Sequence, residues 1–146
     1  MRRFLLVLGL TLGLAGCGGD GDDELTRAEF VEQATAICDR AEARLGELGA
    51  PGSIEELEAY AREAQTVTGD TVDELRELEP PGTLEDGFDR YLARVEEVIG
   101  QLGELEEAAG AGNEAEASRI AGEIGDSAEA EDAARAAGLE ACESDA

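Results

Sequence analysis

The stretch Thr83–Ala109, TLEDGFDRYLARVEEVIGQLGELEEAA, decides the fold. Its large apolar side chains recur at steps of four and three residues, at Leu84, Phe88, Tyr91, Val95, Val98, Leu102 and Leu105. A repeat of 3.5 residues indicates a helix that presents one continuous apolar face to neighbouring helices. Such a helix cannot bury its apolar face alone, so the rest of the chain must supply helical partners.

Three further segments carry helical spacing, over 26–48, 53–79 and 113–137, and the quoted stretch supplies a fourth helix over 83–109. Each begins with a capping signature, in which a short polar residue is followed three positions later by an acid. These pairs are Thr26 and Glu29, Ser53 and Glu56, Thr83 and Asp86, and Asn113 and Glu116. Leu25 and Phe30 flank the first of them in hydrophobic-staple positions. The last segment has the thinnest apolar stripe, mostly alanine with two isoleucines.

Four helices of similar length with short connections predict an all-α, up-down-up-down antiparallel four-helix bundle. No alternating run of β-branched residues indicates a strand. Interior glycines each cost about 1 kcal/mol relative to alanine, and Gly69 beside Asp70 could kink or split the second helix. Phe30, Phe88, Tyr60 and Tyr91 are expected in the core, with both tyrosine hydroxyls at its rim. Asp86 with Arg90, and Glu58 with Arg62, have the spacing of helical ion pairs.

The N-terminus has the pattern of an export signal, with Arg2 and Arg3 followed by the apolar run 4–14. This run is shorter than the roughly 20 residues that a membrane-spanning helix needs. It ends in Leu14-Ala15-Gly16-Cys17, which resembles the lipobox of bacterial lipoprotein precursors. That resemblance implies cleavage before Cys17 and a diacylglyceryl group on its sulfur. The alternative is a plain secretory signal, in which Cys17 is an incidental thiol.

This organisation divides the chain into a signal peptide over 1–16, a flexible acidic tether over 17–25, a bundle over 26–142 and a disordered tail over 143–146. Cys38 and Cys142 remain once Cys17 is lipidated, and export to an oxidising compartment favours a disulfide between them. The alternative is two independent buried thiols. A straight last helix would overshoot Cys38. A helix stop at Gly138 lets the tail fold back toward it, and a break at Gly122 or Gly125 would ease the geometry further.

Composition excludes several classes of function. The chain has 36 acidic residues and 11 arginines, a formal net charge of −25, and no His, Lys or Trp. Nucleic-acid binding is excluded by this charge, and imidazole or lysine chemistry by the missing residues. We expect no catalytic residues, no cofactor and no metal site. The acidic clusters are interpreted as solvated helix faces, and weak cation binding is the alternative.

Beyond the lipobox, the chain resembles small helical lipoproteins of high-GC actinobacteria. The segments that carry this resemblance are FVEQATAIC at 30–38, LEPPG at 78–82, FDRYL at 88–92 and GLEAC at 138–142. This resemblance supplies no activity, because none is known for such proteins. We therefore expect a non-catalytic bundle, anchored by lipid on Cys17 at the extracytoplasmic face of the cell membrane, that binds an envelope protein partner or has a structural role in the envelope. A lipoprotein that binds a cation or another ligand through its acidic faces is the alternative. The acidity itself fits either a high-GC genome or a high-salt habitat.

Overall fold

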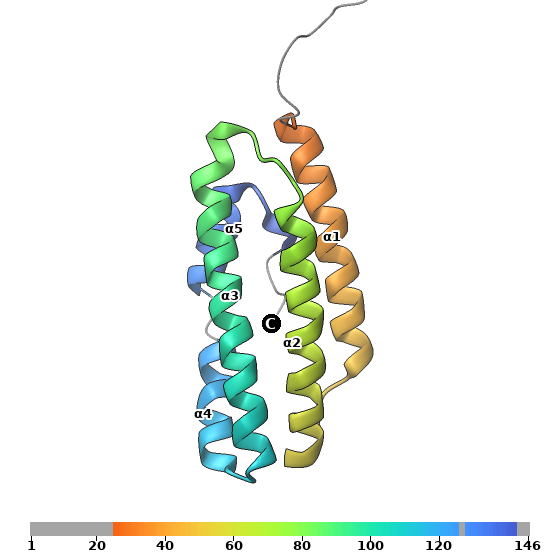
Figure 1. Ribbon diagram of the computed structural model, residues 1–146, viewed down its shortest axis with the longest axis vertical. Coiled ribbons are helices and arrows are strands. Elements are labelled where there is room, and N and C mark those ends of the chain that lie inside the picture. The colour runs from red at the N-terminus through yellow and green to blue at the C-terminus, as the bar shows by residue number, and fades with distance from the viewer. Residues whose placement is uncertain (1–24, 126–127, 143–146) are drawn as a thin grey trace, which may run out of the picture.

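A computed structural model describes residues 25–125 and 128–142, which contain helices joined by short connections and no strand. Its helices are α1 (Arg27–Leu48), α2 (Ile54–Arg76), α3 (Gly82–Gly110), α4 (Glu114–Gly125) and α5 (Ala128–Ala137), followed by the short 3-10 helix η1 (Glu140–Cys142) (Figure 1). The predicted all-α bundle class is therefore confirmed. The signal peptide, nearly all of the tether and the C-terminal tail lie outside the described residues.

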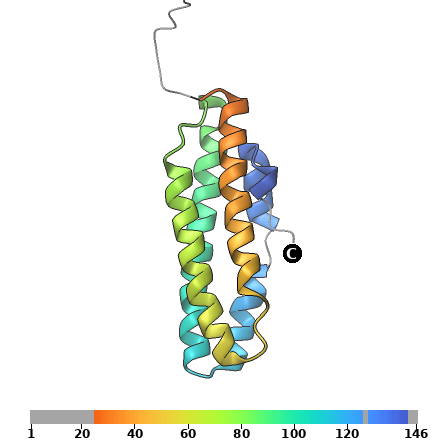
Figure 2. The ribbon, with the colours of Figure 1, turned by 90° about the vertical axis from the view of Figure 1, so that its right-hand side faces the viewer.

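Helices α1, α2 and α3 alternate in direction along the long axis, and α4 and α5 both run opposite to α3 (Figures 1 and 2). Between α1 and α2, Arg40 pairs with Glu74 and Arg44 pairs with Asp70, so the partner number falls as the α1 number rises. The same reversal relates α2 to α3, in the pairs Arg62–Glu106 and Arg76–Glu96. The connections between these helices are short, which favours antiparallel packing of consecutive helices through their apolar stripes.

Three of the four predicted caps form. The Thr26 side chain accepts from the backbone N–H of Glu29, and the Glu29 carboxylate accepts from the Thr26 backbone N–H, which completes a capping box. Ser53 accepts from the N–H of Glu56, at 3.2 Å. The Asn113 side chain accepts from the N–H of Glu116, at 3.3 Å. These bonds satisfy donors that the first turn of a helix leaves open.

The predicted cap at Thr83 is wrong, because α3 begins one residue earlier with Pro81 as its N-cap. Pro81 has extended backbone angles, and its carbonyl already accepts from the N–H of Leu84 at 2.7 Å. Thr83 therefore lies inside the first turn. The second helix is also shorter than predicted and ends at Arg76, where tighter bonds from Glu77 and Leu78 close its last turn.

The segment predicted as a helix over 113–137 is helical on both sides of residues 126–127, with α4 ending at Gly125 and α5 starting at Ala128. Residues 126–127 lie outside the described residues. Helix α5 packs closely on α3, because Gly87 has no side chain to hold off the backbone of Ala136. Helix α2 runs without interruption through Gly69.

The core consists of two clusters at different heights in Figure 1. The upper cluster joins residues of α1, α2, α3 and α5 with Leu139, and Phe30 meets Phe88 edge to face at 5.1 Å. The lower cluster contains Ala61 of α2, Leu105 and Ala108 of α3, and Ala117 and Ile120 of α4. No residue of α1 belongs to the lower cluster as described. The first helix therefore contributes to the core along only part of its length.

Candidate functional site

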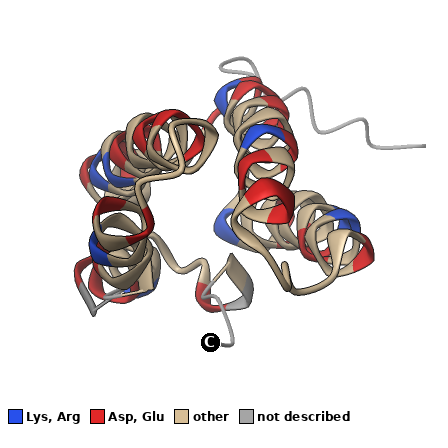
Figure 3. Cartoon of the chain, turned by 90° about the horizontal axis from the view of Figure 1, so that it is seen from below, with Lys and Arg blue, Asp and Glu red and all other residues tan. Residues whose placement is uncertain are grey.

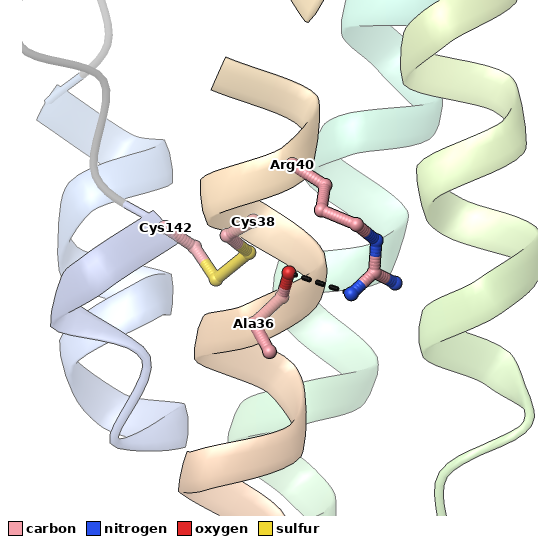
Figure 4. Close-up of a disulfide and its surroundings, with 4 residues drawn as sticks. All are labelled: Ala36, Cys38, Arg40 and Cys142. Carbon is pink, nitrogen blue, oxygen red and sulfur yellow. Dashed lines mark hydrogen bonds between the residues drawn. A yellow bond between two sulfur atoms is a disulfide. The ribbon is translucent and has the colours of Figure 1, made fainter. Parts of the chain in front are cut away.

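The two cysteines of the bundle lie together. Cys38 faces inward from the middle of α1 and is 7% exposed, and Cys142 is the last residue of η1. Their Cα atoms are 5.2 Å apart and the side chains form a disulfide across 104 positions of sequence (Figure 4). This agrees with the pairing predicted from the sequence and with the separation that a disulfide allows.

The turn after α5 brings Cys142 back to α1. Gly138 has a positive φ of 73°, a conformation that glycine adopts without steric cost. The N–H of Leu139 donates to the carbonyl of Ala134 at 2.8 Å, and that of Gly138 donates to Arg135 at 3.1 Å. This pair of bonds is a Schellman motif, and Leu139 completes it by burying its side chain fully. The predicted helix stop at Gly138 is confirmed.

The disulfide secures the middle of α1 on one side, and Arg40 secures it on the other. Arg40 donates to the carbonyl of Ala36 at 2.8 Å and pairs with Glu74 of α2 (Figure 4). The Arg40–Glu74 pair is about half exposed, so it contributes little stability by itself. The cross-link ties this part of α1 to the C-terminal end of the bundle, 104 positions away in sequence.

The tyrosines differ from each other. Tyr91 is 7% exposed in the upper cluster, as predicted, and burial raises its pKa to about 12. Tyr60 is only half-buried, which corrects the prediction that it lies in the core. It lines an open hollow of about 420 Å³ at the connection between α1 and α2, together with Leu48 and Pro51. Tyr91 stays neutral under physiological conditions and serves packing rather than acid–base chemistry.

A second open hollow, of about 380 Å³, lies between α3 and α5. Arg90 and Arg94 line it from α3, and Glu129 and Asp132 line it from α5. Arg90 donates its Nε–H to the backbone carbonyl of Asp86, so the predicted carboxylate pair with Asp86 does not form in the described structure. The charged groups that line it are these two arginines and the carboxylates of Glu97, Glu129 and Asp132.

The charged surface is organised into exposed pairs. Arg62 pairs with Glu58, as predicted, and with Glu106 of α3, and hydrogen bonds to Glu106 and then Glu58 raise its pKa. The Thr26 hydroxyl holds the pKa of Glu29 below its usual value. Ion pairs this exposed are screened by solvent. Over 25–125 and 128–142, no three His, Cys, Asp or Glu residues gather as metal ligands.

Cys17, the predicted acylation site, lies outside the described residues. Within them, no helix is long and apolar enough to cross a bilayer. Comparison of the chain with protein-family models, with curated proteins and with solved structures gives no match. The residues of this chain, and their arrangement, must therefore carry any proposal about function.

Proposed function

We propose that this protein is a non-catalytic lipoprotein, anchored by acyl chains on Cys17 at the extracytoplasmic face of the cell membrane, where its helical bundle binds another envelope protein. The observation that carries the proposal is the sequence Leu14-Ala15-Gly16-Cys17 at the end of a short apolar run behind two arginines. In lipoprotein precursors, the signal peptide ends directly before the cysteine that is acylated.

The disulfide supports export. Structural disulfides form and persist in oxidising compartments, and the Cys38–Cys142 cross-link pins the C-terminal end of the bundle to α1. It also uses both cysteines of the bundle. Cys17 is then the one cysteine left for another use, because the chain has three.

Charge supports a bundle that stands away from the bilayer. Loss of Arg2 and Arg3 with the signal would change the formal net charge from −25 to −27. Anionic headgroups repel such a body. Two acyl chains bury enough methylenes for stable anchoring without any contact between the bundle and lipid. The acidic glycine-rich residues that follow Cys17 are suited to act as a flexible spacer.

The absence of His and Lys from the sequence supports a binding role over catalysis, since it removes the commonest general base and the amine nucleophile. The most deeply buried titratable group with a resolved pKa change is Tyr91, a neutral core residue. A bundle with exposed charged faces and open hollows offers surfaces for recognition instead.

Two measurements test this proposal. Cells that produce the chain would be labelled with alkyne-palmitate and extracted with a detergent that separates into two phases. We expect label and partitioning in the wild type, loss of both in Cys17→Ser, and retention of both in the double variant Cys38→Ser/Cys142→Ser. Partitioning of Cys17→Ser with detergent would overturn the anchor. Cross-linking in intact cells then tests the binding role. If the chain is never recovered covalently linked to another protein, the binding role is overturned.

A further inference from the structure

The bundle holds the two cysteines of the cross-link in different ways. Cys38 lies in the middle of α1, a helix of 22 residues, and is 7% exposed. Cys142 is the last residue of the three-residue helix η1, and its partly buried side chain packs against the upper cluster. One sulfur is therefore fixed in a long helix, and the other lies at the end of the last short element that the structure describes.

The contacts that anchor the C-terminal segment precede Cys142. The turn at Gly138 and the fully buried side chain of Leu139 fix the chain to the upper cluster. The Cys142 N–H then donates to the Leu139 carbonyl at 2.8 Å, a bond within the same short segment. No backbone hydrogen bond among the described residues joins η1 to α1. Without the disulfide, local opening of η1 would break few contacts.

Docking of α5 keeps the two cysteines close even when both are thiols. Gly87 allows α5 to approach α3, and Ala134, Ala137 and Leu139 belong to the upper cluster without help from the disulfide. Helix η1 also packs against α1. A reagent that approaches from solvent therefore reaches Cys38 only after η1 has moved, whereas Cys142 moves with η1.

We infer that Cys142 is the sulfur through which the cross-link is made and exchanged, and that Cys38 is the resolving thiol. This inference rests on the proposed export, which brings the chain into contact with protein disulfides of an oxidising compartment. The co-reactant is the disulfide of such an extracytoplasmic oxidant. The inference adds an order of reaction to the pairing of Cys38 with Cys142.

Formation of the bond takes two exchange steps. The Cys142 thiol loses its proton to solvent and attacks one sulfur of the oxidant disulfide, so that a mixed disulfide forms and the released oxidant thiolate takes up a proton. The Cys38 thiol then loses its proton and attacks the Cys142 Sγ, which displaces the second oxidant thiolate. Two cysteine thiols are oxidised, and one oxidant disulfide is reduced to two thiols by two electrons. Reduction by a dithiol follows the reverse path, with attack on Cys142 and release of Cys38 first.

Pulse alkylation of the reduced full chain tests this order. The Cys17→Ser background leaves two reactive thiols, and cleavage after arginine separates them into peptides 28–40 and 136–146. Short pulses of N-ethylmaleimide followed by mass spectrometry give the rate at each cysteine. We expect Cys142 to react at least about fivefold faster than Cys38 in buffer, because opening of η1 exposes it first. In urea, where neither thiol is protected, the two rates should agree within about twofold.

Single variants in the same background test the exchange step itself. Cys38→Ser and Cys142→Ser are matched, since each retains one bundle thiol and neither forms the cross-link. Acidic residues are spread over the helices in the view from below (Figure 3), so the uncharged probe bis(2-hydroxyethyl) disulfide avoids electrostatic repulsion. The mixed disulfide should form at least about fivefold faster in Cys38→Ser than in Cys142→Ser, and urea should remove the difference. Circular dichroism confirms that both variants are folded.

Three outcomes would overturn the inference. The first is an equal rate at the two cysteines of the reduced chain in buffer, which includes the case in which the reduced chain is unfolded. The second is faster reaction of Cys38. The third is a difference that persists in urea, because it would then come from the local sequence and not from the fold. None of these measurements involves Cys17 or the envelope, so acylation and cross-linking in cells decide the proposed function separately.

Discussion

Replacing Gly87 with alanine tests the close packing of α5 on α3, and Gly100→Ala in the same helix is its control. An ideal Cβ at Gly87 would lie 2.6 Å from the carbonyl oxygen of Ala136 and 2.7 Å from its carbonyl carbon. A Cβ at Gly100 would meet nothing within 4 Å. Both glycines are interior residues of α3, so the change in helix propensity is the same and only the surroundings differ.

The two variants should change stability in opposite directions. Alanine gains about 1 kcal/mol over glycine inside a helix, and Gly100→Ala should realise roughly 0.5–1 kcal/mol of this. At Gly87 the obstacle is helix backbone rather than a flexible side chain, so α5 must move by about 1 Å to restore normal carbon contacts. That movement disturbs Ala134 and Ala137, which are buried in the upper cluster. Overpacking of this kind costs about 1–3 kcal/mol, so after the gain in helix propensity Gly87→Ala should be destabilised by up to about 2 kcal/mol.

Urea and thermal unfolding followed by circular dichroism at 222 nm would measure the difference. For a domain of this size 1 kcal/mol corresponds to roughly 3–5 °C in Tm, so the two variants should differ by about 10 °C. The m-value should stay constant, because neither change alters the surface exposed on unfolding. If Gly87→Ala were as stable as Gly100→Ala, α5 would not pack against α3 as closely as the structure indicates.

Three further predictions concern the cross-link, a buried tyrosine and the net charge. The double variant Cys38→Ser/Cys142→Ser should lose up to about 4–5 kcal/mol of unfolding free energy, because the disulfide closes a loop of 104 positions. Dithiothreitol should destabilise the wild type by the same amount and leave the variant unchanged. Equal stability of wild type and variant in the absence of reductant would refute this prediction. Burial raises the pKa of Tyr91 from 10 to about 12, so the preference of the folded state for the neutral phenol contributes fully to stability below pH 10, and this contribution is lost as the pH rises through about 12. Tyr91→Phe should therefore reduce the fall in stability at alkaline pH. An identical fall in both proteins would contradict the burial of Tyr91. Finally, the Tm should rise as NaCl increases from about 10 mM to about 150 mM, because the Debye length shrinks from roughly 30 Å to 8 Å and screens the excess acids; a constant or falling Tm would show that self-repulsion does not limit stability.

The number and type of most elements could be predicted from the sequence because the signals are local. A 3.5-residue repeat identifies α3 without reference to any other helix, and the caps at Thr26, Ser53 and Asn113 are bonds between residues three apart. The pairing of Cys38 with Cys142 follows from cysteine count and a helix stop at Gly138, and both features form in the structure. Acylation at Cys17 is also a purely sequential signal and stays a prediction.

The tertiary structure decided the features that depend on distant neighbours. Glycines at 87 and 100 are equivalent in the helical sequence, and only the position of α5 makes one of them necessary. Leu45 and Phe30 lie on the same apolar stripe of α1, yet Leu45 is only partly buried and Phe30 is fully buried, since η1 and α5 contact the core beside the upper half of α1. Periodicity determines which side of a helix is apolar. Burial of that side depends on where the other helices lie, and the turn of the chain at Gly138 decides this for the upper half of α1.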